Sequence, residues 1–92
     1  MKMIRAIIRH FVLAELAERL NDTGFGGMTV SEAIHYHGED FLGIPMNLVE
    51  IVLKDEDVEE VVTAIMSVAM EGMIYVFDME GAINIRTGDR GV

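Results

Sequence analysis

The 92-residue sequence contains no cysteine, which excludes a disulfide framework, a thiolate metal site and a cysteine nucleophile. Cations are also scarce, with seven Lys and Arg against sixteen Asp and Glu, and the formal net charge is −9. A nucleic-acid-binding protein needs a basic surface that displaces counterions from phosphates. We therefore expect no nucleic-acid partner.

Long hydrophobic runs are missing as well. No stretch approaches the roughly 20 apolar residues that a membrane-spanning helix requires. The opening Met1-Lys2-Met3-Ile4-Arg5 lacks the apolar centre of a signal peptide. We therefore expect a cytoplasmic protein without membrane insertion. No linker or low-complexity segment divides the chain, so one domain is expected over residues 1–92.

Apolar residues, by contrast, make up 51% of the chain. A domain of this length buries only about 60–65% of the surface that its unfolded chain exposes. Part of the apolar surface must then remain uncovered in a monomer. This surplus predicts self-association.

The first half of the chain predicts a strand, a helix and two further strands. A β-branched run within residues 2–9 is typical of a central strand, and apolar residues at helical spacing predict an amphipathic helix over residues 11–21. Partial alternation predicts a strand over residues 28–37. Residues 46–54 alternate between two mostly apolar sets, so we expect a strand with both faces covered.

The second half predicts a helix and two more strands. The acidic residues 55–57 suit a helix N-terminus, and Asp57 with Glu60 has the spacing of a capping box. Residues 73–78 and 82–86 predict two strands around a tight turn. The fold class is therefore α+β, a ferredoxin-like βαββαβ sandwich with an additional C-terminal strand. Two helices on one side leave the other sheet face bare in a monomer.

Three strings resemble the PII signal-transduction (nitrogen regulatory) family. They are Met1-Lys2-Met3-Ile4-Arg5-Ala6-Ile7-Ile8-Arg9, Gly27-Met28-Thr29-Val30-Ser31-Glu32 and Ile83-Asn84-Ile85-Arg86-Thr87-Gly88-Asp89-Arg90-Gly91. They occur in the order that the family has. The family is a ferredoxin-like homotrimer whose sheets face inward, so the resemblance implies a homotrimer with trimeric PII-like architecture.

Two of the loops on which the family's function depends are altered here. The family's loop after the second strand reaches the regulated transporter or enzyme and carries a modifiable Tyr, whereas here about residues 38–45 remain, without Tyr. The family's phosphate cradle ends Gly-Asp-Gly-Lys, and its Lys is here Met73. Asn84 replaces one family arginine. Because a triphosphate needs clustered N–H groups and cations, we expect weak or absent ATP binding.

Family positions that contact base and sugar are kept. The resemblance implies a reduced ligand cleft between neighbouring subunits, built from Thr29, Glu50, Val52, Gly72, Arg86 and His37. Two alternatives to the ligand roles stay open. Thr29 and Glu50 also suit an ordinary strand, and Arg86 also suits a surface ion pair.

His35 and His37 are two residues apart on a predicted strand, so both side chains project from one face. With His10, Glu39 or Asp40 they could complete a nitrogen and oxygen metal site. Two histidines at this spacing also share a face by chance, as ordinary polar aromatics at the base of a loop.

No nucleophile motif accompanies the serines and no distinctive carboxylate pair occurs, so we expect no enzyme. We expect a PII-like regulator or small-ligand sensor whose partner is a small-molecule effector or a membrane transporter, with the cofactor undetermined. One alternative is a metal-responsive protein that uses His35 and His37, since short-looped relatives are associated with heavy-metal efflux pumps. The other is a ligand-free structural or partner-binding trimer.

Overall fold

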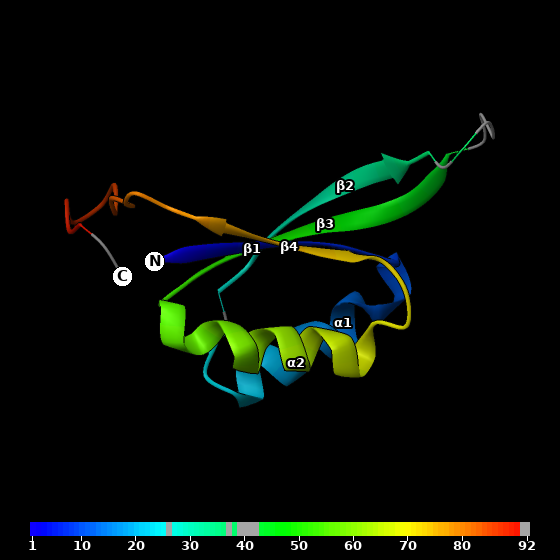
Figure 1. The fold of residues 1–92 in the computed structure, drawn as a ribbon, viewed down its shortest axis with the longest axis horizontal. Helices are drawn as coiled ribbons and strands as arrows, with labels where there is room; N and C mark the ends of the chain where they lie inside the picture. The colour runs from blue at the N-terminus through cyan, green and yellow to red at the C-terminus, as the bar shows by residue number, and fades with distance from the viewer. Residues whose placement is uncertain (26, 37, 39–42, 91–92) are drawn as a thin grey trace.

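The computed structural model describes residues 1–25, 27–36, 38 and 43–90, in which a four-stranded antiparallel sheet carries two helices on one face (Figure 1). The strands, in the order β2-β3-β1-β4, are β1 (Lys2–Ile8), β2 (Thr29–His35), β3 (Ile44–Leu53) and β4 (Met73–Asp78). The helices are α1 (Leu13–Asp22) and α2 (Val58–Val68), entered through 3₁₀ turns at His10–Val12 and Asp55–Asp57. The predicted α+β ferredoxin-like arrangement is confirmed.

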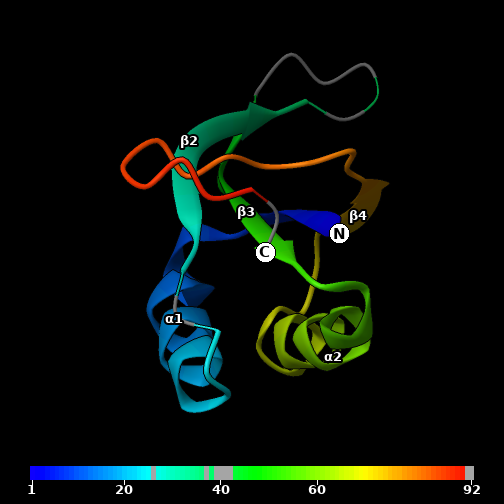
Figure 2. The same ribbon diagram turned by 90° about the vertical axis from the view of Figure 1, so that its left-hand side faces the viewer.

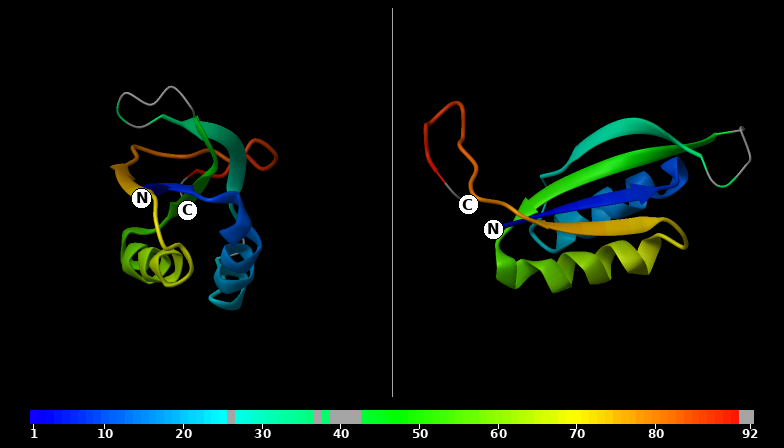
Figure 3. Two further views of the ribbon diagram at one scale, coloured as in Figure 1. Left: turned by 90° about the vertical axis from the view of Figure 1, so that its right-hand side faces the viewer. Right: turned by 45° about the horizontal axis from the view of Figure 1, so that its top comes forward.

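The core lies between the sheet and the two helices, which run side by side beneath it (Figures 2 and 3). The most deeply buried large side chains come from the two central strands and both helices: Ile4, Ile8, Val49, Ile51, Leu16, Leu20, Val61 and Ile65. Their spacing is two or four along the strands and four along the helices, as the pleat and the helical turn require. Each contributes about 1.5–3 kcal/mol by burial.

The predicted capping box at the start of α2 is absent. Asp57 makes no side-chain cap hydrogen bond, and its backbone has φ −94° and ψ −7°. An N-cap side chain reaches the next N–H groups from an extended backbone, which the preceding 3₁₀ turn does not allow. The acidic residues there still suit the positive end of the helix dipole.

The sheet face opposite the helices, here called the outer face, is alternately apolar and polar. It presents three rows of register partners across β3, β1 and β4: Val52-Met3-Phe77, Glu50-Arg5-Tyr75 and Leu48-Ile7-Met73. No helix among the described residues packs on it, and Val52 is 41% exposed. The expectation that both faces of β3 are covered is therefore wrong for the single chain, because both helices pack on the inner face.

The predicted fifth strand over residues 82–86 and the tight turn before it do not form. After β4 the chain leaves the sheet and extends past its end (Figure 1), with a single antiparallel bridge between Ile83 and Arg90 within the segment itself. The Asn84 side-chain oxygen accepts a hydrogen bond from the Arg86 N–H at 2.9 Å. Asparagine favours such side-chain-stabilised turns, and here the turn replaces the strand.

Candidate functional site

Two predicted ligand residues are direct neighbours on the outer face. Thr29 in β2 is the register partner of Glu50 in β3, and Val52 follows on the same face. The Glu50 carboxylate accepts hydrogen bonds from Nη2 and Nε of Arg5, at 3.0 and 3.3 Å. The Arg5 guanidinium also lies 5.1 Å from the centroid of the Phe77 ring, within cation–π range. Glu50 therefore has a protein partner in the absence of any ligand.

Sequence reasoning missed Arg5, although the pattern contained the signal. Ile4, Ala6 and Ile8 occupy the inner face, so the residue between the first two must point outward. In the single chain the Arg5 and Glu50 side chains are 40% and 29% exposed, where an ion pair contributes only about 0–1 kcal/mol. If a neighbouring subunit covered the pair, loss of either partner would leave an uncompensated charge and cost more.

His35 and Gly72 meet at the hairpin end of the outer face. Both border a pocket of about 220 Å³, whose other lining residues are Ile7, Arg9, Ile44, Met46, Glu71 and Met73. Arg9, a cation that sequence reasoning did not consider, forms an ion pair with Glu71 here. The carboxylate thus already neutralises the cation next to the altered phosphate cradle. His37 lies outside the described residues.

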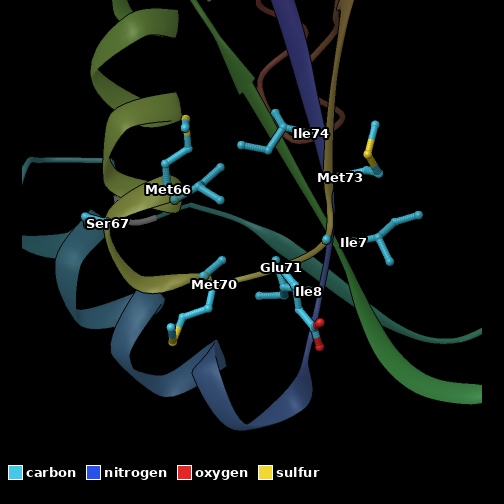
Figure 4. A pocket seen from close by; sticks show the side chains of 11 residues that line it. Ile7, Ile8, Met66, Ser67, Met70, Glu71, Met73 and Ile74 are labelled. Atoms are coloured by element: carbon cyan, nitrogen blue, oxygen red, sulfur yellow. The ribbon is translucent and has the colours of Figure 1, made fainter.

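The connection from α2 to β4 passes close to the end of β1 (Figure 4). Gly72 has φ +127°, and a Cβ atom at this position would overlap the carbonyl oxygen of Ile7. Both features require glycine at this point. On the helix side the same connection borders a larger pocket of about 500 Å³, lined mostly by apolar side chains such as Met66 and Met70, with Ser67 and Glu71 (Figure 4).

The predicted cleft residues fall into separate groups within one chain. Thr29 and His35 begin and end β2, and seven strand residues span about 20 Å. Gly72 precedes β4, whereas Arg86 lies in the exposed segment after it. The structure therefore brings Thr29, Glu50 and Val52 together and His35 and Gly72 together, but it does not join the two groups.

The metal hypothesis gains no third ligand from the described part of the chain. No group of three or more His, Asp or Glu side chains comes together there. His10 borders a separate cavity of about 690 Å³, whereas His35 borders the 220 Å³ pocket. The other proposed ligands, Glu39 and Asp40, lie outside the described residues.

Shifted pKa values mark ion pairs at the opposite end of β1. The N-terminal ammonium donates a hydrogen bond of 2.7 Å to Asp55 and holds the pKa of that carboxyl below its usual value. The hydrogen bond to Asp78 raises the pKa of Lys2. These pairs are exposed and connect β1 to the start of α2 and to the end of β4. They are structural ion pairs and lie at the opposite end of β1 from the pocket at His35 and Gly72.

Along the chain described here, no helix has both the length and the apolarity needed to cross a membrane. The family model for nitrogen regulatory protein P-II matches residues 1–89. The P-II protein of Pasteurella multocida is 39% identical, with 97% of this chain and 95% of the relative covered. The proteins of Rhizobium meliloti and Rhodospirillum rubrum are each 38% identical, covering 100% and 99% of this chain and 97% and 96% of the relatives. The predicted resemblance is confirmed, and the chain belongs to the nitrogen regulatory protein P-II family of signal-transduction regulators.

Proposed function

We propose that this protein is a PII-like regulator or small-ligand sensor that works as a homotrimer. Its ligand cleft lies between neighbouring subunits. Thr29, Glu50, Val52 and Arg86 of one subunit face Gly72, His35 and His37 of the next. The observation that carries the proposal is that the group around Glu50 and the group around Gly72 lie apart in one chain. About 20 Å of sheet divides them, so a second subunit is needed to complete a site.

The surface of the chain supports assembly. It exposes 6566 Å², whereas a monomer of 10.2 kDa is expected to expose about 5,300 Å². The radius of gyration is 14.2 Å, against about 12 Å for a compact chain of this length. The half-covered Tyr75 and Phe77 on the outer face supply apolar area for a subunit contact.

A reduced response to ATP follows from the chemistry at the hairpin end. Met73 supplies no positive charge. Arg9 forms an ion pair with Glu71, so its guanidinium is not free to bind a phosphate. The alignment with the Rhizobium meliloti protein has 109 positions for the 92 residues of this chain, so the relative has segments without a counterpart here. We assign the shortening to the β2–β3 connection, residues 36–43, and thus to the partner-binding loop; with these bounds the connection includes Tyr36, whereas the predicted loop over about residues 38–45 has no Tyr.

The effector is a small molecule, or the regulated partner is a membrane transporter, and neither requires catalysis by this chain. Titration calorimetry of the purified protein with ATP, ADP and AMP, together with light scattering, tests the proposal. We expect a trimer with weak or no binding of ATP and measurable binding of a smaller ligand. A stable folded monomer would contradict the intersubunit cleft.

The second candidate is a metal-responsive protein that uses His35 and His37. The observation in its favour is that His35 borders the 220 Å³ pocket in which the two halves of the site would meet. Neutral imidazoles from neighbouring subunits could then share one ion. Titration with Zn²⁺, Ni²⁺ and Cu²⁺ in the same calorimeter separates this candidate from the first, and absence of any ligand favours a purely structural trimer.

A further inference from the structure

The helical layer carries a large apolar surface that the proposed cleft does not use. Phe11, Met66 and Met70 are 72%, 68% and 98% exposed, and we call these three residues the Met/Phe patch. Phe11 and Met70 border one cavity of about 260 Å³, and Met66 and Met70 border the 500 Å³ pocket, so Met70 links the other two. Figure 4 shows Met66 on α2 and Met70 beyond its end at the edge of this pocket. Contiguous exposed apolar side chains of this kind mark interaction sites.

The patch continues into a groove between the helices. This groove, of about 390 Å³, is lined by Arg19, Thr23, Glu59, Glu60, Thr63, Ala64 and Ser67. Ser67 borders both the groove and the 500 Å³ pocket. On α2, Glu59, Thr63 and Met66 are exposed and spaced by four and three residues, so they follow one solvent-facing stripe, and Met70 lies just beyond the end of the helix. The stripe is acidic where α2 begins and apolar where it ends.

The charge of the helical layer is strongly one-sided. Residues 10–22 and 55–68 hold eight of the sixteen carboxylates and only one of the seven cations. That cation, Arg19, donates a hydrogen bond of 3.0 Å to the Ser67 hydroxyl at the side of the groove. The N-terminal ammonium pairs with Asp55 at one end of the layer, and the other carboxylates give it an excess of negative charge around an apolar anchor point.

Access to this surface does not depend on assembly. The helices cover the inner face of the sheet, and the proposed trimer uses the outer face (Figures 1 and 2). The Met/Phe patch is exposed in the single chain and lies on the layer opposite the proposed subunit contact, and Met70 borders the 500 Å³ pocket together with the cleft residue Gly72. No residue of the proposed ligand cleft belongs to it.

We infer that the α2 stripe and the Met/Phe patch form a docking surface for a basic amphipathic helix of a partner protein. The large apolar side chains of the partner lie on Met66, Met70 and Phe11, where flexible thioethers adapt to their shape. Lysine or arginine side chains one to two turns away lie over Glu59 and Glu60. This is recognition of a helix by its apolar face, with opposite charges that speed encounter and set direction. The inference requires neither a ligand nor the trimer.

The test measures binding of a labelled 18-residue Leu/Lys amphipathic peptide to the full chain by fluorescence anisotropy. A Leu/Glu peptide with the same apolar pattern is the charge-reversed control. The apolar variant is Met66→Ser with Met70→Ser, and its control is Ile85→Ser, because Ile85 is 101% exposed in the C-terminal segment. All three side chains are exposed, so we expect unchanged circular dichroism and melting temperature.

The charge variant is Glu59→Gln with Glu60→Gln. Its control removes the same charge from the other helix, by Glu15→Gln with Glu18→Gln, both exposed on α1. We expect about tenfold weaker binding of the Leu/Lys peptide by either stripe variant, with about twofold or smaller changes for the controls. Raising the salt concentration should weaken wild-type binding further.

Three results would overturn the inference. The first is no binding of the Leu/Lys peptide, or equal binding of the Leu/Glu peptide. The second is an unchanged affinity of the Met66 and Met70 double variant, which would reduce binding to non-specific charge attraction. The third is equal loss in the α1 and α2 charge variants, which would place the contact anywhere on the acidic layer.

Discussion

A charge placed at Leu48 should separate assembly from folding. Leu48 lies on the outer face of β3, opposite Ser31 in β2 and Ile7 in β1, and is half-buried in the single chain. Successive side chains along β3 point to opposite faces of the sheet. Ile51, on the inner face and 2% exposed in the core, is therefore the control on the same strand. We therefore compare Leu48→Asp with Ile51→Asp.

The magnitude follows from burial. A carboxylate moved from water into a covered sheet face costs several kcal/mol, and a threefold assembly repeats this cost in each subunit, for about 10 kcal/mol in total. Since 1.4 kcal/mol is a tenfold change in an equilibrium constant, Leu48→Asp should dissociate the trimer at micromolar concentration. The carboxylate reaches water in the separated chain, so the chain should stay folded.

Light scattering and far-ultraviolet circular dichroism measure the two properties independently. Wild type should have three times the chain mass of 10.2 kDa. Leu48→Asp should have the mass of one chain with retained helix and strand signals, whereas Ile51→Asp should lose its secondary structure. A Leu48→Asp protein that remains a trimer with an unchanged melting temperature would refute the assignment of the outer face as the subunit contact. Unfolding of this variant would refute it as well.

Four further predictions concern the ligand site and stability. Calorimetry with ATP and magnesium should give no micromolar binding, since the cradle lysine and one arginine are missing and each lost charge-assisted contact costs about 1.5–3 kcal/mol; micromolar affinity would show another source of cations. If the metal alternative holds, zinc or nickel should raise the melting temperature at pH 7.5 and much less near pH 5, because protons compete with the metal for imidazole nitrogen; His35→Ala with His37→Ala should remove the rise. Gly72→Ala should lower the free energy of unfolding by about 1–3 kcal/mol, because alanine is strained at φ +127° and meets the β1 backbone, whereas Gly81→Ala, in open space, should be nearly neutral. The N-terminal ammonium lowers the pKa of Asp55, so this pair stabilises the fold above the unfolded-state pKa of about 3.9 and loses its effect as pH falls through the lower folded value. The free energy of unfolding of Asp55→Asn should therefore be lower than that of wild type at pH 6 and converge with it in acid. A difference that stays constant with pH would contradict the pair.

Local pattern was enough for most of the fold. Alternation in β1 and β3 separates inner from outer residues, and the spacing of Leu16 and Leu20 orients α1 toward the sheet. These rules act within a few residues and hold wherever one face is buried. They failed at Asp57, where a 3₁₀ turn replaced an extended N-cap, and after β4, where a turn stabilised by the Asn84 side chain replaced the predicted strand over residues 82–86.

Composition and family resemblance determined the class of the protein, its surplus apolar surface and the identity of the candidate ligand residues. Only the tertiary structure decided how these residues relate, because strand register and connection geometry depend on contacts between distant parts of the chain. It paired Glu50 with Arg5 and Arg9 with Glu71, and it separated Thr29 from the pocket at Gly72. It also brought Phe11 beside the end of α2, a neighbourhood that no spacing along the sequence encodes.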